Sequence, residues 1–157
     1  MASTITAGTL TVKITENVSL NSTNYDSVNI LTIPSINEVN QRIVTLAPQA
    51  QVILFTFDTE TGPGQYVSSD VQYLRITNKD DAHSVGINIQ TIGGGGQNNW
   101  TILNSGRSYI LGSAATSMEA VASAVVGTPV LQDIAKITAY GPTAAAYMDL
   151  ECYIAST

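Results

Sequence analysis

The sequence contains one cysteine, Cys152, and one histidine, His83. A single cysteine excludes a disulfide within the chain and every metal site built from several cysteines. A single histidine cannot form a histidine-rich metal site, and nothing in the sequence makes a nucleophile–histidine pair specific. We therefore expect a protein that is not an enzyme, with no catalytic residues, no metal and no cofactor.

Charge is also scarce, at 11% of residues against about 25% in ordinary soluble proteins. Six Lys and Arg against twelve Asp and Glu give a formal charge of −6, and no basic cluster occurs. Nucleic acids and anionic membrane surfaces both require clustered cations, so neither is an expected partner. No apolar run approaches the roughly 20 residues of a membrane span. The first ten residues lack the positive and apolar regions of a secretory signal, so none is predicted.

Alternation of apolar and polar residues dominates the 157 residues, which fit a single domain over 1–157. In residues 9–15, for example, Leu10, Val12 and Ile14 alternate with Thr11 and Lys13. The same pattern, separated by Gly, Pro, Asn and Ser turns, predicts further strands at residues 28–33, 40–47, 51–59, 71–77, 83–92, 130–140 and 145–156. Residues 99–112 are predicted to hold two short strands around a turn at residues 104–106. At least seven short strands indicate an all-β fold, a jelly-roll-like antiparallel β-sandwich.

Two segments depart from this pattern. Residues 117–126 follow a capping-box spacing and precede Gly127 and Pro129, which favours a short helix over an extended Ala-rich connection. Residues 1–8 precede the first clear alternation and carry no charged side chain. We interpret this stretch as an N-terminal arm that contacts a neighbouring subunit through Ala2, Ser3, Thr4, Ile5, Thr6 and Ala7.

The densest charge surrounds the histidine, in Lys79, Asp80 and Asp81. Asn and Asp favour tight turns, so this stretch predicts the tip of a hairpin joining strands 71–77 and 83–92, with residues 78–83 in solvent. Leu74 and Ile76 would then face the core from the first strand. A catalytic or binding site is the less favoured interpretation.

Other candidate sites also have simpler interpretations. Asp58, Glu60 and Asp70 carry oxygen ligands suited to calcium, but their spacing does not match the twelve-residue calcium loop, so solvated loop carboxylates are favoured. The glycines at residues 93–96 lack the Lys-Ser/Thr of a phosphate-binding loop. Cys152 lies in an alternating segment and is expected to be a buried strand residue.

The C-terminal half has an order of strands and turns that carries a resemblance. Its segments are YLRITNKDDAHSVGINI, NNWTILNSGRSYILG and LQDIAKITAYGPTAAAYMDLECYIAST, within residues 71–157. This order resembles small β-sandwich virion structural proteins of tailed bacteriophages, especially cyanophage-like ones. The resemblance implies a capsid decoration (cement) protein or a tail or fibre component, often a trimer, in the virion assembled in the host cytoplasm. Its partners would be copies of itself and virion proteins such as the major capsid protein.

A carbohydrate-binding sandwich is the alternative from another functional class. Trp100, Tyr66, Tyr73 and Tyr109 would stack on sugar rings, while Asn98 or Asn99 would bind hydroxyls. Trp100 lies beside Ile102 and Leu103 in the sequence, however, and is expected to belong to the core. An exposed Trp100 would favour this alternative.

Overall fold

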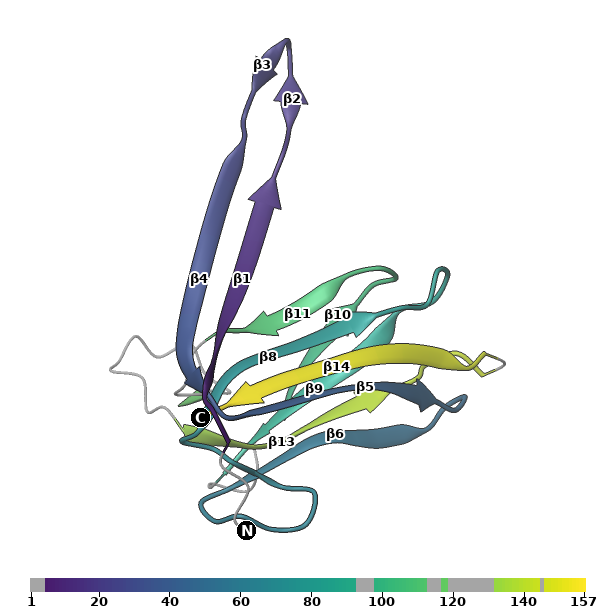
Figure 1. Cartoon of the computed structure of the whole chain (residues 1–157). Helices are drawn as coiled ribbons and strands as arrows, with labels where there is room; N and C mark the ends of the chain where they lie inside the picture. The colour runs from purple at the N-terminus through teal and green to yellow at the C-terminus, as the bar shows by residue number, and fades with distance from the viewer. Residues whose placement is uncertain (1–4, 93–97, 113–116, 119–131, 145) are drawn as a thin grey trace, which may run out of the picture.

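Most of the alternating segments form two antiparallel sheets packed face to face (Figure 1). The computed structural model describes residues 5–92, 98–112, 117–118, 132–144 and 146–157. Every regular element in these ranges is a β-strand. The prediction of an all-β sandwich is therefore confirmed.

Each sheet of the sandwich contains four main strands. Sheet I has the order β11 (Ser108–Leu111), β8 (Val71–Asn78), β14 (Met148–Ser156) and β5 (Glu38–Leu46). Sheet II has the order β10 (Asn98–Leu103), β9 (Val85–Thr91), β13 (Gln132–Tyr140) and β6 (Gln51–Asp58). Two short strands add to sheet II: β7 (Tyr66–Val67) runs parallel to β6, and β12 (Ser117–Met118) pairs with β13.

The pairing follows a simple rule along the chain. The strands β5, β6, β8 and β9 pair with β14, β13, β11 and β10 in that order. The eight strands are thus one long antiparallel ribbon that folds over itself, so that successive pairs fall in different sheets.

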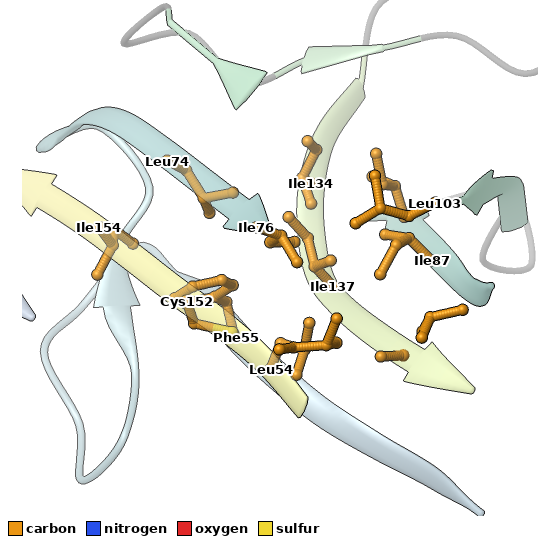
Figure 2. Packing of buried hydrophobic residues seen from close by; sticks show 14 of the residues in the cluster. Leu54, Phe55, Leu74, Ile76, Ile87, Leu103, Ile134, Ile137, Cys152 and Ile154 are labelled. Atoms are coloured by element: carbon orange, nitrogen blue, oxygen red, sulfur yellow. The ribbon is translucent and has the colours of Figure 1, made fainter. Parts of the chain in front are cut away.

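The core lies between the two sheets, where alternate residues of each strand point inward. Figure 2 shows Ile76 of sheet I beside Ile137 of sheet II, and Leu74 and Ile87 belong to the same cluster. These four side chains are fully buried. Cys152, on β14, is 1% exposed and belongs to the same cluster, which confirms its predicted burial.

A long hairpin projects away from the sandwich (Figure 1). Its strands are β1 (Gly8–Glu16) and β4 (Ser27–Ile36), and its tip is the short pair β2 (Ser19–Leu20) and β3 (Thr23–Asn24). Asn21 and Ser22 both have positive φ, at 51° and 64°, which is the two-residue turn that matches the twist of a hairpin. We call residues 8–36 the arm.

Two predictions of local structure need correction or restriction. The stretch 71–92 is not a hairpin, because β8 lies in sheet I and β9 in sheet II, so residues 79–84 cross between the sheets. Of the predicted helix at 117–126, Ser117 and Met118 form the strand β12. Residues 119–126 lie outside the described part of the chain.

Candidate assembly surface

The arm has one apolar face because its two strands alternate in matching register. Leu10 lies opposite Ile33, and Val12 lies opposite Leu31. Ile14 continues the row toward the tip. Such a face is stable only when a second layer covers it.

The sandwich covers this face at the root of the arm and leaves the rest open. Ile33 and Ile36 are buried against Tyr73 and Ala155 on the outer face of sheet I. Farther out, Leu31 and Ile14 are already 40% and 44% exposed. The apolar face therefore extends beyond the surface that covers it.

Apolar exposure continues toward the tip and onto the other face of the arm. Thr11, Lys13 and Thr15 alternate with the apolar row, but their partners include Ile30 and Val28. Five side chains, each more than half exposed, make up this distal apolar surface: Val18, Leu20, Tyr25, Val28 and Ile30.

A groove runs between the arm and the outer face of sheet I. It has a volume of about 390 Å³ and is lined by Val12 and Ile14 from the arm and by Tyr73, Ile110 and Tyr153 from the sheet. The rings of Tyr73 and Tyr153 meet edge to face at 5.9 Å. Burial raises the pKa of the Tyr73 hydroxyl, and the nearby positive charge of Arg75 opposes this shift only in part.

Two charged side chains, Lys13 and Arg75, lie among the residues that line the groove. The Arg75 guanidinium lies 3.3 Å from the carboxylate of Glu151 on the neighbouring strand, so this cation is already paired. Lys13, at the arm side of the groove, is exposed. The groove is therefore an apolar channel with polar margins.

The predicted N-terminal contact segment adjoins the arm. Residues 1–4, including Ala2, Ser3 and Thr4, lie outside the described residues. Ile5, Thr6 and Ala7 are exposed and lead directly into β1. Their role in contacting a neighbour remains a prediction.

The charged stretch around His83 forms the crossover between the sheets. Asp80 Oδ1 accepts hydrogen bonds from the backbone N–H groups of Ala82, at 2.8 Å, and His83, at 2.6 Å. The His83 ring nitrogen Nδ1 lies 3.1 Å from the same oxygen. Hydrogen bonds from Ala82 and then His83 hold the pKa of Asp80 below its usual value.

Asn78 organises the base of this crossover. The expectation that residues 78–83 lie in solvent is wrong for Asn78, whereas Lys79, Asp81 and Ala82 are exposed and Asp80 and His83 are half-buried. Asn78 is completely buried. Its Nδ2 donates to the carbonyl oxygens of His83, at 2.8 Å, and Leu103, at 3.0 Å. Asn78 Oδ1 accepts from the N–H of Asp80 at 3.0 Å. The stretch therefore joins three segments through one buried amide, a role suited to structure.

The loop carboxylates proposed for calcium are engaged locally. Asp58 Oδ1 accepts from the N–H of Thr59 at 2.7 Å, and Asp70 Oδ1 accepts from the hydroxyl of Ser69 at 2.8 Å. Among the described residues, no three His, Cys, Asp or Glu side chains gather in a way that could hold a metal ion. The glycine-rich stretch 93–96 lies outside the described residues.

Trp100 is not a core residue, which corrects the expectation from its neighbours in sequence. It pairs opposite Asn88 on the outer face of sheet II and is 54% exposed. Ile102 shares this face and is 74% exposed, whereas Leu103 points inward and is buried. The indole lies across Gly86, where a Cβ would come within 3.2 Å of its ring.

The other aromatic candidates do not continue a row from Trp100. Tyr73 is buried under the arm. Tyr109 is inward-facing on sheet I and packs against the core, and Tyr66 contacts the ring of Phe55. Asn98 accepts a hydrogen bond from Asn88 Nδ2 at 2.9 Å beside Trp100. Only Trp100 and Asn98 of the sugar-binding candidates therefore lie on the outer face of sheet II.

Comparison with known proteins gives no further identification. No model of a known protein family matches the chain, and no curated protein shows significant similarity to it. None of the described residues forms a helix both long and apolar enough to cross a membrane.

Proposed function

We propose that the protein is a non-enzymatic structural protein of a bacteriophage virion, a capsid decoration (cement) protein that associates with copies of itself, as a trimer, and with the major capsid protein. The observation that carries this proposal is the projecting arm with its uncovered apolar side chains. A tail or fibre component would use the same features and is the closest alternative.

The proposed sandwich type is an eight-stranded jelly roll. The strand order supports this type. The first four main strands pair with the last four in reverse order, first with last, and the pairs alternate between two four-stranded sheets, as in a jelly roll. Jelly rolls occur in viral capsid proteins and in lectins, so the fold is compatible with both candidate functions.

Self-association is supported by the energetics of the arm. A two-stranded hairpin is at best marginally stable alone in water. Val18, Leu20, Val28 and Ile30 are each 55–59% exposed. Burying the exposed half of four such side chains would contribute on the order of 3–6 kcal/mol per copy. A neighbouring protein surface can supply that cover.

The sparse charge of the chain supports the same proposal. The arm carries Lys13, Glu16 and Asp26, and its remaining polar groups are mainly Thr, Ser and Asn. Neutral polar groups lose less solvation free energy than charged groups when an interface buries them. Burial of an unpaired charge costs on the order of several kcal/mol. The arm can therefore enter an interface without burying many charges.

The test uses two exposed positions on the arm. We expect light scattering at micromolar concentration to give the mass of three chains for the wild type, and the V28K/I30K double variant to dissociate while its circular dichroism still shows a folded β-protein. I102K is the matched control, because Ile102 is 74% exposed on sheet II, and it should remain trimeric. A wild-type mass of 16.5 kDa would contradict the proposed self-association, and a trimeric arm variant would contradict the role of the arm in it.

Location in the particle is tested separately. Antibodies against the protein should label the heads of negatively stained phage particles. Labelling confined to tails or fibres would replace the capsid assignment with the closest alternative, and unlabelled particles would remove the virion role.

A carbohydrate-binding module is a second candidate, favoured by the exposure of Trp100. Its indole forms a flat apolar platform next to Asn88 and Asn98. If sugars bind there, a soluble oligosaccharide should change the tryptophan fluorescence, and W100A should lose retention on a glycan array. Equal retention of the wild type and W100A would exclude this face.

A further inference from the structure

The strand β5 forms one edge of sheet I and is long and regular. Its nine residues pair with β14 without a shift in register, and no other strand of the described chain pairs with it. The outer edge of β5 therefore presents a row of backbone N–H and C=O groups over about 30 Å, from the rise per residue of a strand. Such an edge is a template for another strand.

The remaining edges of the two sandwich sheets in the described chain are shorter or partly covered, and the longer edges of the arm carry protecting residues, Lys13 on β1 and Pro34 on β4. The edge strand β11 has four residues and β10 has six. The end of β6 is paired with β7, and its register with β13 is interrupted by an irregularity. In contrast, β5 contains none of the Pro, Gly or Lys residues that protect exposed edges.

Arg42, the one cation of β5, is already engaged within the chain. Its side chain points into the sandwich, where a guanidinium N–H donates to the carbonyl oxygen of Leu54 and the guanidinium carbon lies 5.3 Å from the centre of the Phe55 ring. The single acidic residue of the strand, Glu38, balances this charge. Two copies of β5 can therefore approach without a net repulsion between the strands, although the whole chain carries −6.

The side chains of β5 are complementary to themselves when the strand is reversed. With a twofold axis at Gln41, an antiparallel pair brings Val39 opposite Ile43 of the second copy, and Ile43 opposite its Val39. These two side chains face outward and are 52% and 58% exposed. Gln41, between them, is held on the sheet surface by a hydrogen bond from Nε2 to Glu151 Oε1.

The inward-facing positions also match in this register. Asn40 lies opposite Arg42 of the second copy, so an amide, not a second cation, faces each guanidinium. A twofold axis at Arg42 would instead place the two arginines opposite each other, where like charges destabilise a strand pair. Of these two axes, the one at Gln41 is favoured for both faces of the sheet.

We propose that the β5 edges of two copies pair antiparallel about a twofold axis at Gln41, which joins the two copies of sheet I into one eight-stranded sheet. This contact is isologous, so it closes at two copies. It goes beyond the proposed function, because it does not use the arm. Of the two contacts, the β5 contact is proposed to be the weaker: arm-linked trimers pair through β5 transiently in solution, where the mass stays that of three chains, and stably only when they are held side by side in the particle.

Cysteine cross-linking tests the register. Directly opposed residues in a strand pair have Cα atoms about 4.5–5.5 Å apart, within the range of a disulfide. We expect Q41C to give a linked dimer of twice the 16.5 kDa chain mass under mild oxidation. T45C is the matched control on the same face of β5, because its two copies would lie about 26 Å apart at 3.3 Å per residue.

A mixed pair makes the test specific. V39C and I43C should each remain unlinked alone, since identical positions would lie about 13 Å apart, but a mixture of the two should yield the linked dimer. Wild-type protein is the blank for the buried Cys152. Failure of Q41C to link, or equal linking of Q41C and T45C, would overturn the proposed pairing.

The arm variant separates this proposal from the previous one. Q41C linking should persist in V28K/I30K, because those positions lie outside β5. In the chain with an intact arm, Q41C linking without a trimer would support β5 pairing and contradict the arm contact. A trimer without Q41C linking would do the reverse.

Discussion

The carboxylate of Asp80 holds the crossover between the two sheets, and its removal is the sharpest test of the structural interpretation of this charged stretch. The side chain is only 12% exposed. It accepts two backbone hydrogen bonds, from Ala82 and His83, while Ser105 Oγ donates to the Asp80 carbonyl oxygen at 2.8 Å. Asp81, the next residue, is exposed and serves as the matched control.

The expected cost follows from the two hydrogen bonds. Replacing a side chain that caps backbone N–H groups typically costs about 0.5–2 kcal/mol. We expect D80A to lower the free energy of unfolding by about 1–2 kcal/mol, because both N–H groups lose a charged acceptor. D81A should change it by no more than about 0.5 kcal/mol, as ordinary surface substitutions do.

The dependence on pH gives an independent check. Because the folded state lowers the pKa of Asp80, its ionised form stabilises the fold fully above the unfolded pKa of about 3.9, and this contribution is lost as the pH falls through the folded pKa. D80N lacks a titrating group there. The stability difference between the wild type and D80N should therefore be largest near neutral pH and shrink below about pH 4.

Denaturant unfolding followed by circular dichroism at neutral and acidic pH measures both effects. Equal stabilities of D80A and D81A would refute the capping role of Asp80. A difference between the wild type and D80N that stays constant into the acid range would refute its electrostatic part. Binding or catalytic loss in D80A without loss of stability would indicate a site in place of a structural crossover.

Four further predictions concern the core and sheet II. N78A should cost more stability than D81A in denaturant unfolding, since it leaves the carbonyl groups of His83 and Leu103 without their buried donor. I87A should lower the free energy of unfolding by about 2–5 kcal/mol in the same assay, as deletion of a buried Ile does. Because burial raises the pKa of the Cys152 thiol to about 11, a thiol reagent at pH 8 should label it only after unfolding; rapid labelling of the folded protein would contradict its burial. Acrylamide should quench the fluorescence of Trp100 efficiently, and a shielded tryptophan would show that the outer face of sheet II is covered in solution.

The positions of strands and their inward faces were predictable because a period of two depends only on the chain itself. Leu74 and Ile76, like Ile87 and Ile89, are buried as the alternation requires. The predicted turn at residues 104–106 is present, with Gly106 at a φ of 68° and Arg107 N–H donating to the Asn104 carbonyl oxygen at 3.1 Å. These features need no knowledge of which strand lies beside which.

The partners of each strand were not predictable in the same way. The stretch between β8 and β9 has the turn residues of a hairpin, yet the two strands belong to opposite sheets. Asn78 accounts for the difference, because its buried amide bonds to Leu103, which lies 25 residues away in the sequence. Trp100 shows the same limit. Trp100 and Ile102 point to the outer face of sheet II and are exposed, whereas Leu103, one residue on, points inward and is buried, and the apolar sequence alone does not tell which face is the inner one.

The arm shows that apolar alternation cannot by itself distinguish a core strand from an interface strand. Residues 9–15 alternate as regularly as the strands of the sandwich, and the sequence pattern predicts strands both there and at residues 28–33 without distinguishing them from the strands of the core. The eight main strands already fill two four-stranded sheets whose inner faces cover each other, so the additional pair, β1 and β4, has no inner face available. Its root uses the outside of sheet I, where Ile33 and Ile36 are buried, and its distal half extends past that support. A pair of apolar strands that the core cannot cover therefore indicates a partner. This excess can be recognised only when the positions of all the other strands are known.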